Sequence, residues 1–156
     1  MPLTLLVVVS IGLRFWAAIL VPVPWIVPDE FVYGLLGESL YHTGHFSILG
    51  GPVRFYTLVV PIVVGAPLSI GDRETGYALL KIVQATVMSL AAVPVYLWGR
   101  AFLGRGKALL AAALTLAIPG LAYSGLIMTE VEFYPIAVVA AWALARALER
   151  LSLIHI

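Results

Sequence analysis

The chain of 156 residues has no cysteine and few charged residues. Without cysteine it forms no disulfide framework and no thiolate metal site, and it has no thiol nucleophile. Charged residues make up 11% of the chain, and its nine basic residues are scattered, so no basic stripe is available for nucleic acid. These absences exclude disulfide-stabilised proteins, zinc–thiolate proteins and nucleic-acid-binding proteins.

Apolar residues dominate the composition instead. Hydrophobic residues make up 62% of the chain, and the mean hydropathy is +1.06. A soluble domain of this size would need far more polar residues to cover its surface. We therefore expect an all-α, multi-pass transmembrane helix bundle that forms a single domain over residues 1–156, with membrane lipids as its solvent.

Four apolar stretches predict membrane-spanning helices, because a bilayer crossing needs roughly 20 apolar residues. They cover residues 3–21, 77–98, 108–128 and 131–148. A cleaved signal peptide is the alternative for the first stretch, but it lacks a basic start and a small-residue cleavage site. Residues 22–76 hold most of the acids and are predicted to form a loop outside the cell.

The loop is predicted to contain two membrane-associated elements. Asp29 follows a proline and is a good helix N-cap, and apolar residues then recur at helical spacing, which predicts an interfacial helix over residues 29–42. Residues 55–70 are apolar, but two prolines and a glycine interrupt them. They predict a re-entrant or interfacial segment, with a membrane crossing as the alternative.

Positive charge sets the expected orientation. Residues 99–107 carry three basic residues and no acid, and the last stretch ends in two arginines. Basic segments stay in the cytoplasm, so the N-terminus is expected inside and the first loop outside, provided that residues 55–70 do not cross. Asp29, Glu30 and Glu130 then share the external face.

These three acids are the candidate functional groups. Any one of them alone is explained as an ordinary loop acid in headgroup water, but a cluster at the ends of spans indicates a polar cavity. Pro28 gives Asp29 and Glu30 a rigid position at a helix N-terminus, which favours their ionised forms. An ionised Asp29 can accept a proton from a hydroxyl nucleophile. Asp29 and Glu130 are also candidate ligands for Mg²⁺ or Mn²⁺.

Several of these features together resemble a known enzyme family. They are the apolar N-terminal helix followed by Pro28-Asp29-Glu30, the interfacial helix with Tyr33, and the segment from Lys81 to Glu130. They resemble GT-C-type glycosyltransferases and are similar to protein O-mannosyltransferases and the aminoarabinose transferases of lipid A. The resemblance covers almost the whole chain but only the front of that fold. We therefore expect an N-terminal piece of a longer plasma-membrane protein, inactive by itself.

The resemblance implies a reaction and a set of roles. A sugar would pass, with inversion, from a polyprenyl-phosphate-linked donor to a hydroxyl of an acceptor protein, glycan or lipid. Asp29 matches the family's first-loop acid, the general base, with Glu30 beside it. Glu130 would hold a metal ion or the donor phosphate. Arg54 and Lys81 are candidates for steadying that phosphate, with interfacial snorkelling as the alternative.

Two other classes of function stay open. A transporter or channel would use the acids as a proton or cation relay, but it would spread them through the depth of the membrane. A membrane scaffold without enzymatic activity would need neither the acids nor the rigid Pro28-Asp29-Glu30 sequence.

Overall fold

The computed structural model describes residues 2–21, 28–54, 57–117 and 122–152, and these are mostly helical. Within them, three helices are long and apolar enough to cross a membrane. They are α1 (Pro2–Ile19), the stretch Arg73–Gly99 formed by α4 (Arg73–Ser89) and α5 (Ala92–Gly99), and α7 (Thr129–Ser152). These candidate spans agree with the expected all-α fold and indicate a multi-pass membrane protein.

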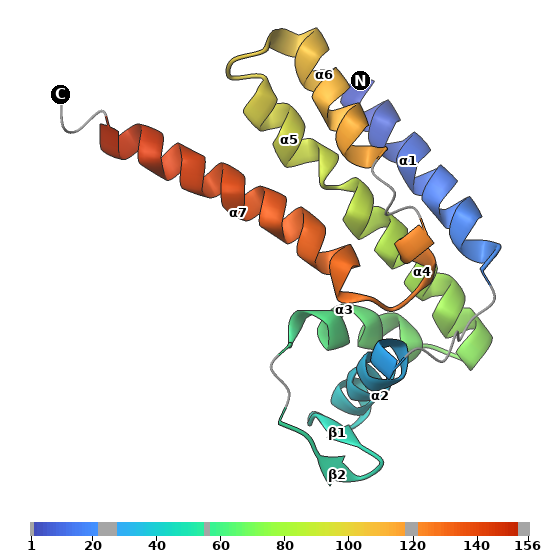
Figure 1. Ribbon diagram of the computed structural model, residues 1–156. Helices are drawn as coiled ribbons and strands as arrows, with labels where there is room; N and C mark the ends of the chain where they lie inside the picture. The colour runs from blue at the N-terminus through green and yellow to red at the C-terminus, as the bar shows by residue number, and fades with distance from the viewer. Residues whose placement is uncertain (1, 22–27, 55–56, 118–121, 153–156) are drawn as a thin grey trace.

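The stretch formed by α4 and α5 is the centre of the bundle (Figure 1). Half of the residues (50%) in its most apolar part are buried inside the protein, compared with 22% for α1 and 11% for α7. Asp72 caps α4, because its side chain accepts a hydrogen bond from the backbone nitrogen of Thr75 at 2.8 Å. The stretch is interrupted at residues 90–91, about one turn before Pro94, whose ring removes a helix hydrogen bond.

The predicted continuous helix over residues 108–128 is wrong. Its helix, α6 (Gly104–Leu116), has 13 residues and is therefore about 20 Å long. The 3₁₀ helix η1 (Ala122–Gly125) and a non-helical stretch precede α7, and residues 118–121 lie outside the described residues. The early end of α6 has a local cause, since Pro119 lacks a backbone donor and disfavours helical geometry in the residue before it.

Side chains of the neighbouring helices bind carbonyl groups on both sides of this interruption. The buried guanidinium of Arg14 in α1 donates to the carbonyl oxygen of Leu116 at 3.0 Å and to the hydroxyl of Ser124 at 3.3 Å. The amide of Gln84 in α4 donates to the carbonyl oxygen of Leu126 at 2.8 Å. A carbonyl within a bilayer cannot bond to water, so these donors let the chain leave the helix inside the bundle.

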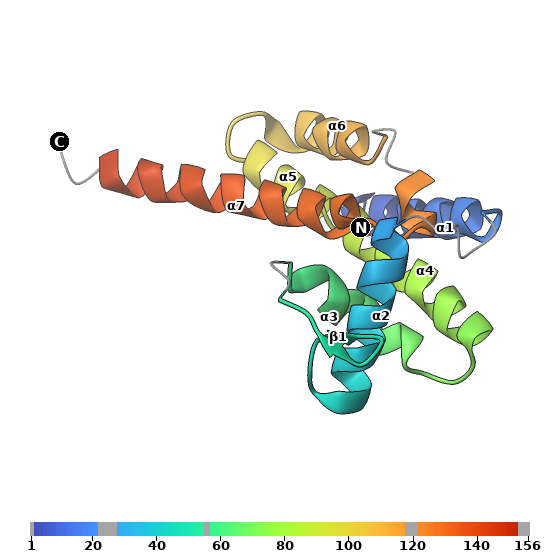
Figure 2. The ribbon, with the colours of Figure 1, turned by 60° about the horizontal axis from the view of Figure 1, so that its bottom comes forward.

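The first loop forms a separate group of elements at one end of the bundle (Figures 1 and 2). It contains α2 (Pro28–Thr43), the antiparallel pair β1 (Ser47–Ile48) and β2 (Gly51–Pro52), and α3 (Val59–Leu68). With ten residues, α3 is about 15 Å long and too short to cross a bilayer. Residues 22–27 and 55–56 of the predicted loop lie outside the described residues.

Two apolar clusters hold these elements together. One joins α2 and α3 to α4 and to the non-helical segment before α7. It consists of Tyr33, Val60, Val64, Leu68, Leu80 and Ile127. The other joins α1, α5 and α6 toward the opposite end, around Val7, Ala92, Ala112 and Leu116. The first cluster, which we call the Tyr33 cluster, therefore brings the start of α7 to the α2–α3 end.

α2 and α3 pack at a close approach of two glycines. A Cβ atom added to Gly37 would lie 2.7 Å from the Cα atom of Gly65. One added to Gly65 would lie 2.6 Å from the carbonyl carbon of Gly37. Both distances are well inside van der Waals contact, so the two backbones touch only because neither residue has a side chain.

We predict that Gly37→Ala destabilises the purified protein in detergent by roughly 1–3 kcal/mol, because the methyl group forces α2 away from α3. Thermal unfolding and limited proteolysis within α2 and α3 measure this change. The matched control is Gly12→Ala in α1, where an added Cβ meets nothing within 4 Å. Equal stability of the two variants would contradict the close approach.

Candidate functional site

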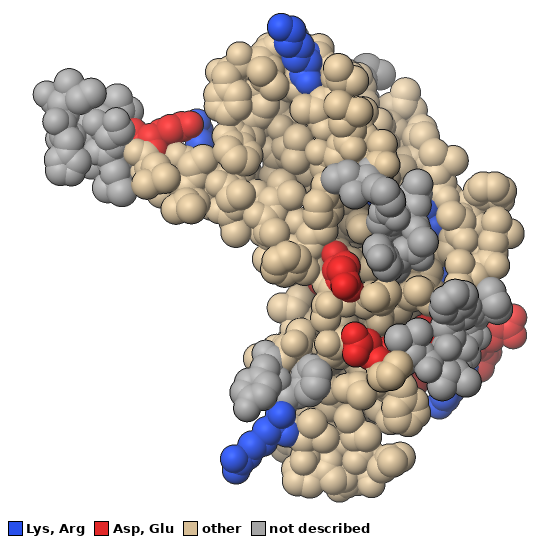
Figure 3. Space-filling view, in the orientation of Figure 1, with Lys and Arg blue, Asp and Glu red and all other residues tan. Residues whose placement is uncertain are grey.

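Asp29 and Glu130 lie on one face of the molecule. Asp29 is in the first turn of α2 and Glu130 in the first turn of α7, and both are exposed. Figure 3 shows acidic side chains over the starts of these two helices, with basic side chains toward the edges of the same face. The fold thus gathers acids from distant parts of the sequence.

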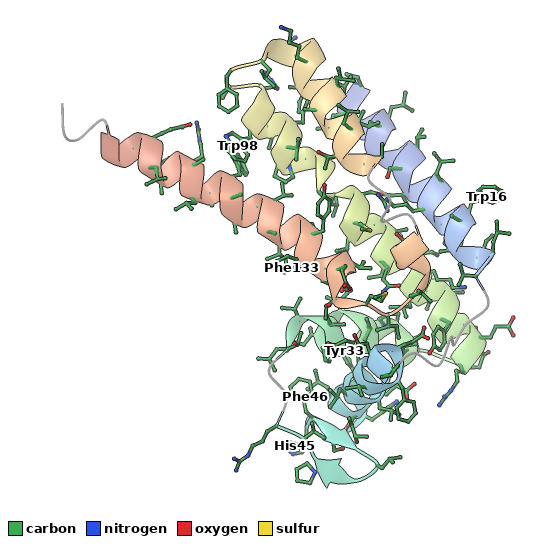
Figure 4. The ribbon with its side chains drawn as sticks, in the orientation of Figure 1. Trp16, Tyr33, His45, Phe46, Trp98 and Phe133 are labelled. Carbon is green, nitrogen blue, oxygen red and sulfur yellow. The ribbon has the colours of Figure 1, made fainter. Side chains whose placement is uncertain are left out.

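The hydroxyl of Tyr33 is affected by the charges of both acids. Its side chain is buried in the contact of α2 with α3, below the start of α7 (Figure 4). Burial raises the pKa of its hydroxyl, and the charge of Asp29 raises it further. A hydrogen bond with Thr57 lowers this pKa, while the charge of Glu130 raises it. The electrostatic influence of both carboxylates on one hydroxyl indicates that the starts of α2 and α7 lie on the same side of the Tyr33 cluster.

Glu30 points elsewhere, although it is adjacent to Asp29. It is 2% exposed and lines a small cleft of about 90 Å³ with Glu38, Arg73 and Tyr77. Successive residues on a helix point in directions roughly 100° apart, so neighbours easily serve different surfaces. The pair is therefore divided: Asp29 belongs to the face shared with Glu130, and Glu30 to the contact between α2 and α4.

Lys81 lies beside Glu30, inside the protein. Its side chain is 7% exposed, and its amine donates to the carbonyl oxygen of Val21 at 3.0 Å. The charge of Glu30 acts on this amine as well. Lys81 thus connects the residue chain just after α1 to α4, and its charge is close enough to Glu30 of α2 to be affected by it. Arg54 is exposed after β2. Phosphate binding by Lys81 or Arg54 stays a prediction.

A divalent cation at this site would depend on the substrate. Among the described residues, no group of three or more histidine, cysteine, aspartate or glutamate side chains could hold a metal ion. Asp29 and Glu130 supply two carboxylates. Mg²⁺ and Mn²⁺ often bind one or two carboxylates together with water and substrate phosphates. A cation held by these two residues would therefore need water or phosphate oxygens to complete its shell, and metal binding stays a prediction.

Glu132 is an acid that the sequence interpretation missed. It is 2% exposed, and neither of its carboxylate oxygens has a hydrogen-bond partner among the described residues. The charge of Glu130 acts on it. A buried carboxylate without partners is unfavourable, and in a membrane protein such groups often bind ions or protons. The available signal was a second acid two residues after Glu130, at the start of an apolar stretch.

Comparison of the chain with known protein families, with curated proteins and with solved structures gives no match. A function therefore has to be argued from the site itself. Chemically, this face offers an exposed carboxylate at Asp29, a second one at Glu130, and the buried hydroxyl of Tyr33, on which both charges act.

We predict that Asp29→Asn lowers the pKa of Tyr33, because it removes a negative charge that opposes ionisation of the hydroxyl. Thr57→Val should raise the same pKa, since the hydrogen bond that it removes favours the ionised form. Carbon NMR of ring-labelled tyrosine over alkaline pH measures both shifts, with Tyr33→Phe assigning the signal.

Glu74→Gln is the matched control, because Glu74 is an exposed acid in the first turn of a different helix, α4. It should leave the titration of Tyr33 unchanged. An Asp29→Asn variant that titrates like the unsubstituted protein would show that Asp29 does not act on Tyr33.

Proposed function

We propose that the chain belongs to a plasma-membrane glycosyltransferase. The enzyme moves a sugar from a polyprenyl-phosphate-linked donor to an acceptor hydroxyl at the external face of the membrane, with inversion at the anomeric carbon. Asp29 is the general base, and Glu130 orients the donor phosphate or a cation bound to it. The acceptor is a protein, a glycan or a lipid.

The observation that supports this proposal is that two exposed acids from distant parts of the sequence, Asp29 and Glu130, lie in the first turns of helices that meet at the Tyr33 cluster, where the charge of each raises the pKa of Tyr33. Glu130 is in the first turn of α7, a candidate span, and Asp29 is in the first turn of α2, which shares the Tyr33 cluster with Ile127, just before α7. We place both carboxylates near the depth of the lipid headgroups. A donor anchored by its lipid tail is confined to the same depth. Confinement of the donor beside a fixed base lowers the entropy cost of bringing the reactants together.

The reaction follows from these positions. Asp29 takes the proton of the acceptor hydroxyl while the oxygen of that hydroxyl bonds to the anomeric carbon of the sugar. The bond from that carbon to the phosphate oxygen breaks, and the lipid phosphate leaves with both electrons. Attack from the side opposite the phosphate inverts the anomeric centre. Tyr33, whose pKa is raised, keeps its proton and can donate a hydrogen bond to the acceptor or the sugar.

A transporter or channel with an acidic relay is the second candidate, and Glu132 favours it. This carboxylate is buried within a candidate span and has no hydrogen-bond partner among the described residues. A relay uses buried carboxylates of this kind, and Glu132 would be its first member, because it lies in the first turn of the span, about 3 Å along the helix from Glu130. In the glycosyltransferase, Glu132 would instead be a buried neighbour of Glu130.

We predict that Asp29→Asn in the full-length protein lowers sugar transfer by about 100-fold or more, the range of general-base catalysis. Membranes from producing cells are assayed with a panel of radiolabelled polyprenyl-phosphate hexoses and pentoses. Glu74→Gln, an exposed acid outside the site, should retain full activity. A fully active Asp29→Asn variant, or no transfer from any donor by the unsubstituted protein, would contradict the proposal.

A further inference from the structure

The C-terminal half of α7 leaves the bundle. Figures 1 and 2 both show this half extending away from the other helices, and only 11% of the most apolar part of α7 is buried. Its departure opens a groove against the end of α5. The groove has two adjoining parts that share Trp142 and Arg146: one of about 350 Å³ between the end of α5 and α7, and an open one of about 460 Å³ that runs along the face of α7 alone. These volumes are typical of small-molecule sites, roughly 300–1,000 Å³.

The charged side chains of this groove all have the same sign. Arg100 and Arg146 line one part, and Arg146 and Arg150 line the other, with no acid among the lining residues described. Arg146 does contact the nearby carboxylate of Glu149 at 3.4 Å, but both side chains are about half exposed, so this pair is weak. The groove therefore has a net positive charge that an anion would neutralise.

The remaining lining is aromatic and aliphatic. Trp98 of α5 and Trp142 of α7 line the first part, and Figure 4 shows Trp98 between these two helices. Val139 and Ala143 line the second part, on the side of the groove nearer the middle of α7. Tryptophan is enriched at the depth of lipid headgroups, while small aliphatic side chains suit acyl chains. One ligand that matches both features has a phosphate and a hydrocarbon tail.

We propose that this groove binds the headgroup of an anionic phospholipid, such as phosphatidylglycerol, in the cytoplasmic leaflet. The phosphate lies between Arg100 and Arg146, and an acyl chain follows Val139 toward the middle of α7. A protein helix in the same groove would have to bring acids of its own to neutralise the arginines. A zwitterionic lipid brings a positive group along with its phosphate, so it neutralises them less well.

Tryptophan quenching by brominated lipids tests the proposal. The chain has four tryptophans, so Trp16→Phe and Trp25→Phe leave emission only from the two in the groove. The protein is reconstituted into phosphatidylcholine vesicles that contain increasing fractions of lipid with brominated acyl chains. Brominated phosphatidylglycerol should reach half-maximal quenching at a mole fraction on the order of tenfold lower than brominated phosphatidylcholine, since each arginine favours the anionic lipid severalfold.

Arg100→Gln combined with Arg146→Gln should bring the two half-maximal fractions close to equality, and quenching by phosphatidylcholine shows that this variant is still inserted. The control is Arg105→Gln combined with Lys107→Gln, two exposed basic residues of α6 outside the groove, which should keep the difference. Equal half-maximal fractions in the protein with both arginines would overturn the proposal. So would a difference that survives their removal. Absence of quenching by either lipid would also overturn it, because protein would then cover the groove.

Discussion

The structure depends on how a broken helix is accommodated inside a membrane bundle. Where α6 ends, its last carbonyl groups have no partner within the helix, and a bilayer offers no water to replace one. At the end of α6, Arg14 of α1 donates to the carbonyl oxygen of Leu116, and the hydroxyl of Tyr134 donates to that of Thr115 at 3.3 Å. Beyond the break, Gln84 of α4 donates to the carbonyl oxygen of Leu126. A cation at the C-terminal end of α6 also interacts favourably with the helix dipole.

The early end of α6 also sets the position of the candidate site. Because the chain leaves α6 early, Ile127 reaches the Tyr33 cluster, and α7 begins beside α2 and α3. Glu130 thereby comes to the face that already carries Asp29. Lys81 donates to the carbonyl oxygen of Val21, just after α1, and Gly37 lets α2 lie directly on α3, so α2, which carries Asp29, is packed closely against its neighbour.

The sequence predicts what depends on local pattern. Long apolar runs predicted α1, the α4–α5 stretch and α7, and the helical spacing of apolar residues predicted α2. The prediction that Asp29 is the N-cap of α2 is wrong, because the helix already begins at Pro28, whose ring suits the first turn, and Asp29 is therefore inside that turn. The end of α6 could not be predicted, because Pro119 is also compatible with a kinked span, and the donors that stabilise the break are distant in sequence. Arg14 is the clearest example. Its place within an apolar run indicates a charge that is unfavourable in a membrane, and only the carbonyl oxygen of Leu116, to which it donates, explains why it lies there. Packing likewise leaves Asp29 exposed and buries its neighbour Glu30, which the sequence alone does not indicate.

Single-cysteine labelling in intact cells tests the shared external face most directly, because the chain has no native cysteine. The substitutions are Asp29→Cys, Asp72→Cys, Arg105→Cys and Glu130→Cys, all at exposed positions. A membrane-impermeant maleimide should label positions 29, 72 and 130 from outside, and position 105 only after the membrane is opened. Labelling of positions 29 and 130 from opposite sides would contradict the shared site and favour a transporter.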